Sequence, residues 1–333
     1  MKKILALIMT LSIFVLSGCS SQTDRMVTDR EGIEVNIPTK IEKIISTAPS
    51  NTEVLMALGL GDKLVAIDKY STDIEGINTE LPQIDFLNPD AETIIGLEPD
   101  IVIASGHNKT GSVEDPFKAI SEAGIPVVYI PSSDSIDGIY KDIEFIADVV
   151  NERSKGKEIV DDMKAQVEEI KAIGDTITDK KSVYFEISPA PYLSSFGKST
   201  FLNEMIEIIG AKNIFENEEG WISPTAEAII DAFLNEMIEI IGAKNIFENE
   251  EGWISPTAEA IIDANPDVII TNAGYMENPT EEIKSRDAWE NINAIKNNEV
   301  YLVDQNASSR PSQNVIKALE QMAKAVYPEH YEK

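Results

Sequence analysis

The chain has very little cysteine and histidine: one cysteine, Cys19, and two histidines in 333 residues. A single cysteine excludes an intramolecular disulfide and every metal motif that is built from several cysteines. A bare zinc or manganese site needs three or four converging histidine and carboxylate ligands, and the only histidines are His107 and His330. We therefore expect neither a disulfide framework nor a metal ion as cofactor.

Positive charge is also scarce. The sequence has 28 Lys and Arg residues against 58 Asp and Glu residues, which gives a formal net charge of -30. Nucleic acid binding needs a basic surface, so this charge excludes it. The sequence also lacks a phosphate-binding loop and a Ser-His-Asp catalytic set, which leaves no motif for the common classes of enzyme.

Long hydrophobic runs are absent apart from one near the N-terminus. Residues 4–15 are apolar and follow two lysines, and the run is too short for a comfortable membrane span. This pattern predicts a secretory signal peptide over residues 1–18. The LSGC sequence that ends at Cys19 resembles the lipobox of bacterial lipoproteins, in which the cysteine is lipidated. Residues 19–26 are expected to form a polar tether, and an ordinary signal peptide with a chance cysteine is the alternative.

Strand and helix patterns alternate along most of the remaining chain. An edge hairpin is expected at residues 28–38, followed by strand and helix patterns in turn, such as KIISTA, NTEVLMALG and KLVAID. Residues 136–150 and 160–170 have the 3,4 spacing of amphipathic helices, and a second alternating region begins at residue 182. Alternating strands and helices predict mostly parallel sheets covered on both faces. The predicted fold class is α/β, with two three-layer lobes and helical segments between them.

A stretch of the second lobe is duplicated: residues 201–232 are repeated without a change as residues 233–264. The first copy follows Thr200, which can cap a helix, and the second leads directly into Asn265 and a strand pattern. We expect the fold to use the first helix of copy one and the last helix of copy two. The insertion left between them has an apolar 3,4 register that predicts one fused helix over about 224–241. The competing arrangement loops out a whole copy.

A weaker internal similarity relates the two lobes. AETIIGLEPDIVIASG, from Ala91, aligns without a gap with AEAIIDANPDVIITNA, from Ala258. A Pro-Asp pair between a helix and a buried strand is a general way to end one and begin the other. That role does not explain why Glu92 and Glu259 occupy the same position in each lobe.

Several segments together resemble the substrate-binding lipoproteins of ABC importers, in the branch that binds cobalamin, ferric siderophores and haem. They are LSGC, APSNTEVLMALGLGDKLVAID, the paired PDIVIAS and PDVIITN units, and SSRPSQNVIKAL near the C-terminus. The resemblance implies an N-terminal lobe at 27–151, one long rigid helix at 152–175 and a C-terminal lobe at 176–331, with a ligand cleft between the lobes. It also implies an extracytoplasmic protein that a lipid on Cys19 anchors to the cell membrane.

The resemblance further implies partners. They are the permease of an ABC importer and its ATPase, and in that family one acidic residue on each lobe docks on the permease. Glu92 and Glu259 match those two positions. A plain solvated face is the alternative in so acidic a chain.

Ligand contacts are expected in the loops after the strands, because open α/β sheets bind ligands beyond the carboxyl ends of their strands. Aromatic side chains collected there suit a flat or apolar ligand. The candidates in the first lobe are Ser50, Asn51, Tyr70, Phe86, Ser105, Gly106 and His107. Those in the second lobe are Ser188, Tyr192, Gly197, Trp221 or its copy Trp253, Asn272, Tyr275 and Arg310.

The charge of these loops bears on the ligand. An anionic siderophore favours several arginines or lysines, and Arg310 is the one clear candidate, helped by Lys69 or Lys198. His107 or a tyrosine is able to ligate haem iron. A corrinoid mostly needs aromatic and backbone contacts, so a metal chelate of the cobalamin type is slightly preferred over a ferric siderophore or haem. A chelatase-like enzyme of similar architecture and a lipid-anchored adhesin are the alternatives to a binding protein.

Overall fold

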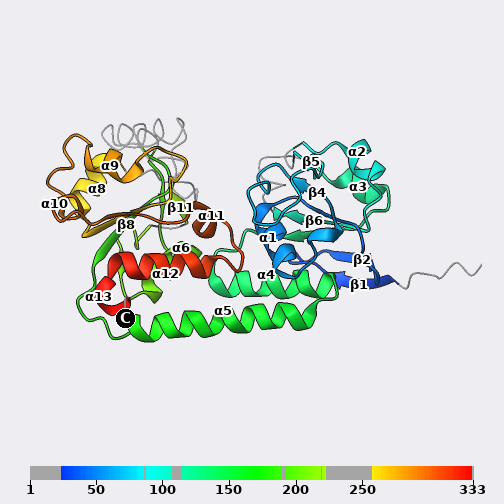
Figure 1. The fold of residues 1–333 in the computed structure, drawn as a ribbon, viewed down its shortest axis with the longest axis horizontal. Helices are drawn as coiled ribbons and strands as arrows, with labels where there is room; N and C mark the ends of the chain where they lie inside the picture. The colour runs from blue at the N-terminus through cyan, green and yellow to red at the C-terminus, as the bar shows by residue number, and fades with distance from the viewer. Residues whose placement is uncertain are drawn as a thin grey trace, which may run out of the picture.

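The computed structural model describes residues 24–85, 88–106, 115–189, 193–218, 220–222 and 257–331. They form two α/β lobes side by side, and the long helix α5 (Arg153–Gly174) runs along one side of both (Figure 1). The predicted fold class is thereby confirmed. The expected signal peptide and Cys19 lie outside the described residues. Within those residues, no helix combines the length and the apolar character that a membrane span requires.

The first lobe is built on a five-stranded parallel sheet with the order β5-β4-β3-β6-β7. Strands β3, β6 and β7 are buried almost throughout, which explains why their sequences are apolar runs without alternation. The strands are β1 (Asp24–Thr28), β2 (Glu34–Pro38), β3 (Ile44–Ser46), β4 (Leu64–Asp68), β5 (Gln83–Ile84), β6 (Ile101–Ser105) and β7 (Val127–Ile130). The helices are α1 (Pro49–Ala57), a short 3-10 turn (Gly61–Lys63), α2 (Ala91–Gly96), α3 (Lys118–Glu122) and α4 (Ile136–Val149).

The expected edge hairpin is formed by β1 and β2, and it includes part of the predicted tether. The tether was expected over residues 19–26, but residues 24–26 pair with β2. Arg25 finds partners on another element: its guanidinium donates to the Asp148 carboxylate at 3.3 Å and to the carbonyl oxygen of Val149 at 3.2 Å. Polar composition is therefore no obstacle to a strand whose side chains are paired.

The second lobe has a four-stranded parallel sheet with the order β10-β8-β12-β13 and a separate antiparallel pair of β9 and β11. The strands are β8 (Ser182–Glu186), β9 (Ser195–Phe196), β10 (Lys212–Asn213), β11 (Trp221–Ile222), β12 (Val268–Thr271) and β13 (Val300–Leu302). The helices are α6 (Phe201–Ile208), α8 (Ala258–Ala264), α9 (Pro279–Lys284), α10 (Asn293–Lys296), α11 (Gln305–Ser309), α12 (Val315–Val326) and α13 (Pro328–Tyr331).

The Pro-Asp pairs of the two lobes do the same structural work. The Asp100 carboxylate accepts a hydrogen bond from the backbone N–H of Lys43 at 2.9 Å, at the start of the lobe's first parallel strand. In the second lobe, the Asp267 carboxylate accepts from the backbone N–H of Ser182 at 3.1 Å. Each aspartate thus fixes the register between two neighbouring strands, which gives a physical reason for a repeated Asp after the Pro.

Helix α5 packs closely on both lobes. Its buried side chains include Val160, Met163 and Val167, at the 3,4 spacing that the sequence predicted. Near its first turn, a Cβ atom added at Gly156 would lie 2.2 Å from the Cβ atom of Ala147 on α4, so only glycine permits this approach. Gly174, the last residue of α5, lies equally close to the backbone at the end of α6, since a Cβ atom added there would be 2.1 Å from the Ile208 carbonyl oxygen.

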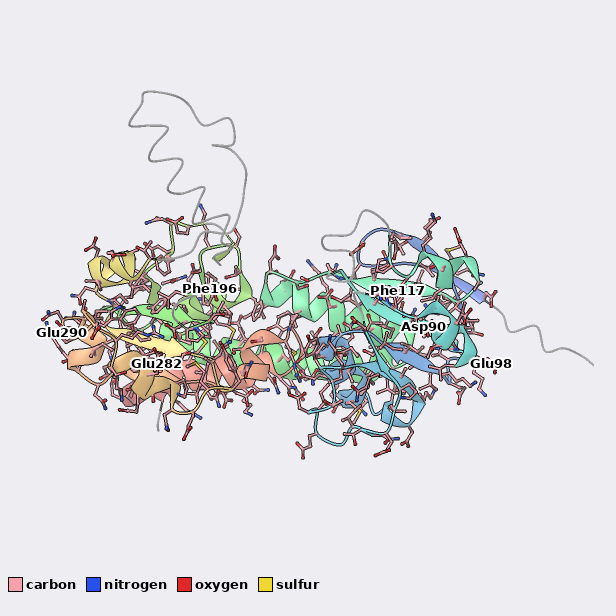
Figure 2. The ribbon with its side chains drawn as sticks, turned by 90° about the horizontal axis from the view of Figure 1, so that it is seen from above. Asp90, Glu98, Phe117, Phe196, Glu282 and Glu290 are labelled. Atoms are coloured by element: carbon pink, nitrogen blue, oxygen red, sulfur yellow. The ribbon has the colours of Figure 1, made fainter. Side chains whose placement is uncertain are left out.

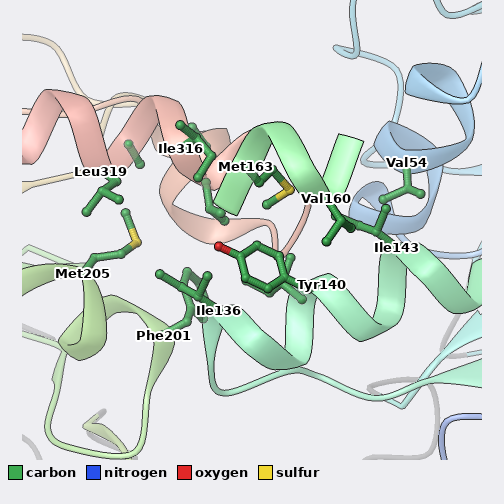
Figure 3. Close-up of a cluster of buried hydrophobic side chains, with 14 of the residues drawn as sticks. Val54, Ile136, Tyr140, Ile143, Val160, Met163, Phe201, Met205, Ile316 and Leu319 are labelled. Carbon is green, nitrogen blue, oxygen red and sulfur yellow. The ribbon is translucent and has the colours of Figure 1, made fainter. Parts of the chain in front are cut away.

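One hydrophobic core continues from lobe to lobe. It extends from Val54 on α1 and Ile143 on α4, through Met163 on α5, to Phe201 on α6 and Leu319 on α12. Figure 3 shows these side chains converging where α4, α5, α6 and α12 meet. The lobes are therefore joined by packed side chains as well as by the chain itself.

The duplicated stretch contributes to the second lobe from both copies. Helix α6 comes from the first copy, and its cap Thr200 accepts from the backbone N–H of Asn203 at 3.2 Å. Helix α8 comes from the second copy and is capped by Thr257, which accepts from Ala260 at 3.1 Å. The expected use of one helix from each copy is confirmed. The competing arrangement, in which a whole copy is looped out, is wrong, because α6 and α8 come from different copies. The fused helix predicted over 224–241 lies outside the described residues.

Candidate functional site

The predicted ligand residues lie on both lobes near the carboxyl ends of strands. Ser50 and Asn51 begin α1, Tyr70 follows β4, and Ser105 ends β6 just before Gly106. In the second lobe, Ser188 and Gly197 flank β9, Asn272 and Tyr275 follow β12, and Arg310 follows α11. Phe86, His107, Tyr192 and Trp253 lie outside the described residues. Trp221 contributes its backbone to β11.

Two tyrosines stand out among these residues by their exposure. The Tyr70 residue is 55% exposed and Tyr275 is 64% exposed, although large aromatic side chains are normally buried. One belongs to the first lobe and the other to the second, and each lies in a loop that follows a central strand. The Lys69 ammonium group is 5.1 Å from the centre of the Tyr70 ring.

Two other candidates have structural roles. The buried Asn272 amide donates to the hydroxyl groups of Ser308 and Ser309 at 3.0 and 3.1 Å, which holds α11 against the end of β12. At Gly197, an added Cβ atom would lie 2.1 Å from the carbonyl oxygen of Glu218. Close backbone packing therefore accounts for this glycine.

Asn51 differs from both. It is 2% exposed, and its side-chain Nδ2 has no hydrogen-bond partner among the described residues. It lies in the first turn of α1, whose N-cap Ala48 provides no side-chain hydrogen bond. A buried donor without a partner is costly, so the Asn51 amide is a candidate to donate a hydrogen bond to a ligand.

Arg310 joins the lobes. Its guanidinium donates to the Glu53 carboxylate at 3.0 Å, to the Asp73 carboxylate at 2.9 Å and to the Tyr70 carbonyl oxygen at 3.1 Å. The side chain of Glu53 is 5% exposed and that of Arg310 is 11% exposed, so most of this contact is removed from water. Ser312 also donates to the Glu53 carboxylate. We call Glu53, Asp73, Arg310, Ser312 and Asn314 the interlobe cluster.

The other contacts of the interlobe cluster complete the pairing of its carboxylates. Asn314 donates to the second Glu53 oxygen at 2.9 Å, and Asn306 donates to Asp73 at 2.8 Å. Burial raises the pKa of Asp73, but hydrogen bonds from Arg310 and Asn306 outweigh burial and hold that pKa below its ordinary value. The cluster therefore keeps Asp73 charged at neutral pH.

A second buried network supports the loop that carries Tyr70 and Asp73. The Asp68 carboxylate, at the end of β4, accepts from the backbone N–H of Tyr70 at 2.8 Å and from the Ser71 hydroxyl. The Ser71 hydroxyl lies 3.0 Å from that of Thr52 on α1. Burial is the main influence on Asp68 and raises its pKa, against the hydrogen bond from Ser71. The network fixes how the loop leaves the sheet.

Glu53, Asp73 and Ser312 were not among the ligand residues predicted from the sequence. Glu53 is an acidic residue among the buried positions of α1, which is the kind of position where a charge needs a partner. The apolar residues around Glu53 in the sequence therefore indicated a buried carboxylate that needs a partner. Its partners lie more than two hundred positions away, so no local pattern identified them.

The predicted docking residues occupy equivalent exposed places. Glu92 and Glu259 are each the second residue of a short helix, after the caps Asp90 and Thr257. Both helices, α2 and α8, lie on the side of the molecule away from α5 (Figure 1). Figure 2 shows Asp90 on the first lobe, with Glu282 and Glu290 marking the second.

Two surface cavities formed by the described residues lie outside the predicted ligand residues. One, of about 430 Å³, lies at the start of α5 and is lined by Arg25 and residues 151–154. The other, of about 340 Å³, lies between α5 and α12. Among the described residues there is no group of three or more His, Cys, Asp or Glu side chains arranged to hold a metal ion.

Comparison with known proteins identifies the family. The model of the periplasmic binding protein family matches residues 44–234 and 230–307. The uncharacterized ABC transporter substrate-binding lipoprotein YvrC of Bacillus subtilis is 30% identical over 340 aligned positions, which cover 96% of each chain. The two segments of the family match overlap at residues 230–234, inside the duplicated stretch.

Two further similarities agree with this family. The vitamin B12-binding protein of Vibrio parahaemolyticus is 30% identical over 178 positions, covering 53% of this chain and 62% of that protein. A crystal structure of a possible iron-binding, periplasmic solute-binding protein from Staphylococcus epidermidis superposes with a TM-score of 0.68 and 29% identity, covering 87% of this chain and all of that one. The chain therefore belongs to the periplasmic binding protein family, as a substrate-binding protein of an ABC transporter and not an enzyme.

Proposed function

We propose that the protein binds a metal chelate between its lobes and delivers it to the permease of an ABC importer, with its ATPase. A corrinoid of the cobalamin type is preferred over a ferric siderophore or haem. The observation that carries this proposal is the pair of exposed tyrosines, Tyr70 and Tyr275, one on each lobe at the end of a central strand. Exposed aromatic rings in loops after the strands suit a flat, largely apolar ligand.

The relatives support the choice of ligand class. One matching protein is named for vitamin B12, and a similar structure is described as possibly iron-binding. Asn51, with an unpartnered buried donor at the start of α1, suits a ligand that carries carbonyl or amide oxygens. Corrinoids carry such amides around their rim.

The test is direct binding. Tryptophan quenching and native mass spectrometry of the purified protein should detect at least one of cobalamin, haem and ferric siderophores with a Kd below about 10 μM, roughly -7 kcal/mol. Replacing both Tyr70 and Tyr275 with Ala should weaken binding at least tenfold, or about 1.4 kcal/mol. The control is Met26→Ala, which removes another exposed apolar side chain on the β1 strand. If no chelate binds below 10 μM, the proposal is wrong.

We also propose that a lipid on Cys19 holds the protein at the membrane, with residues between Cys19 and β1 as the tether. A Cys19→Ser variant should then appear in the soluble extracytoplasmic fraction, while the parent protein sediments with membranes. Equal sedimentation of the two would contradict the anchor and leave the binding function untouched.

A further inference from the structure

We infer that the ligand carries no net negative charge, and that Asp73 enforces this selectivity by occupying Arg310. The inference rests on the proposed function, because it concerns the ligand held between the lobes. It rules out a polyanionic ferric tricatecholate and favours a neutral or cationic chelate.

The first step is that the arginine expected to receive an anion is already paired. Arg310 donates to Glu53 at 3.0 Å, to Asp73 at 2.9 and 3.1 Å, and to the Tyr70 carbonyl oxygen at 3.1 Å. Its side chain is 11% exposed. An acidic group on a ligand would have to take the place of one of these partners.

The two carboxylates differ in how firmly they are held. Glu53 is buried and is also held by hydrogen bonds from Ser312 and Asn314, so releasing it from Arg310 would leave a buried carboxylate without its positive partner. Asp73 is half exposed, at 51% of its side chain, and is the partner that an incoming anion would meet. After exchange, the anion would lie beside the fixed charge of Glu53. The exchange is therefore unfavourable for an anion and is not required of a neutral ligand.

The second step is the charge of the surrounding loops. The described segments that follow β4, β7, β12 and β13 are residues 69–82, 131–135, 272–278 and 303–314. Together they contain six acidic residues, namely Asp73, Glu75, Glu80, Asp134, Glu277 and Asp304, against the two basic residues Lys69 and Arg310. The field of these loops repels anions before any contact forms, and the net charge of -30 adds to it.

The test compares probes of different charge. Cyanocobalamin has no net charge, ferrioxamine B is a cationic ferric trihydroxamate, and ferric enterobactin is a strongly anionic tricatecholate. We expect the parent protein to bind one of the first two at least about a hundredfold more tightly than ferric enterobactin. Asp73→Asn should raise the affinity for ferric enterobactin about tenfold, because it frees Arg310 from one of its two carboxylate partners.

The matched control is Glu75→Gln. It removes the same charge from the same exposed loop, but Glu75 is not a partner of Arg310. Equal gains from Asp73→Asn and Glu75→Gln would show a general field effect and overturn the role of Asp73. Tighter binding of ferric enterobactin than of both other probes would overturn the inference and leave the proposed function standing. If none of these probes binds and haem does not bind either, both the inference and the proposed function are wrong.

Discussion

At the scale of single residues, Glu53 is a buried charge whose substitution should be costly. Glu53→Gln keeps the size of the side chain but removes the charge that pairs with Arg310 in a setting largely closed to water. We expect the free energy of unfolding to fall by about 2 to 3 kcal/mol, because Arg310 then loses the more deeply buried of its two carboxylate partners. Urea denaturation of the two proteins measures this difference.

Glu75→Gln again provides the control. Glu75 is exposed, so its substitution should change the free energy of unfolding by less than about 0.5 kcal/mol. If Glu53→Gln has as small an effect as this, the interlobe cluster does not stabilise the fold.

Asp73 adds a dependence on pH. Its hydrogen bonds with Arg310 and Asn306 hold its pKa below the ordinary value of 3.8. A pKa that is lower in the folded state means that the ion pair stabilises the protein above pH 3.8 and loses this contribution as the pH falls through the folded pKa. The contribution is small, because Asp73 is half exposed. The thermal midpoints of the parent protein and Asp73→Asn should therefore differ at about pH 6, and the difference should shrink as the pH falls below 3.8. A difference that stays constant over this range would contradict the assignment.

Local residue roles were predictable from sequence where the partner is nearby. Thr200 was expected to cap a helix, and its partner is three residues away. Arg310 was expected to meet a ligand, yet its carboxylate partners come from the other lobe. Residue type indicated that Arg310 needs a negative partner, but only the packing of the lobes decides whether that partner is a ligand or the protein itself.

At the scale of elements, the equivalent helices α2 and α8 have a proposed docking function that mutation can test. Glu92 and Glu259 hold the same position on these equivalent helices and are exposed. We propose that they dock on the permease, and we expect Glu92→Lys combined with Glu259→Lys to abolish uptake. Ligand affinity of the purified double variant should change less than about twofold, since charge at an exposed surface is screened by salt. Chelate uptake by cells and binding by the purified protein measure the two effects.

Glu227, the counterpart of Glu259 in the first copy, lies outside the described residues and precedes no strand pattern. Glu227→Lys should leave uptake unchanged. Loss of ligand binding in the Glu92 and Glu259 double variant would contradict a docking role, and an effect of Glu227→Lys would show that the first copy takes part.

The elements recovered from sequence are those with a clear pattern. The buried strands β3, β6 and β12 lie in continuous apolar runs, and α5 is long enough to show a 3,4 period. The two-residue strands β9, β10 and β11 are too short to show a period. They form because their backbones pair with neighbouring segments of the fold. The structural role of Gly197 could not be predicted from sequence either, since its close approach to the Glu218 backbone depends on how the two segments pack.

At the scale of the whole molecule, the duplication should be dispensable. Deleting residues 233–264 restores a single copy with unchanged flanks, so the sequence that forms α8 is still followed by Asn265 and β12. The cost of closing a connection grows only slowly with its length, so we expect the thermal midpoint to stay within about 3 °C and the Kd within about twofold. Differential scanning calorimetry and ligand titration test this. A large loss of either would show that the insertion belongs to the working fold.

The core that continues through α4, α5, α6 and α12 also bears on communication with the permease. A hinged binding protein signals occupancy by its outline, because the empty and loaded forms differ in the angle between lobes. In this protein, such a rotation would pull Met163 and Phe201 out of a packed interior, which close-packed side chains resist. We therefore expect small-angle scattering profiles with and without ligand to be nearly superimposable. The permease must then recognise the bound ligand by the ligand atoms that the binding protein leaves exposed. It would distinguish loaded from empty binding protein by surface chemistry and not by conformation.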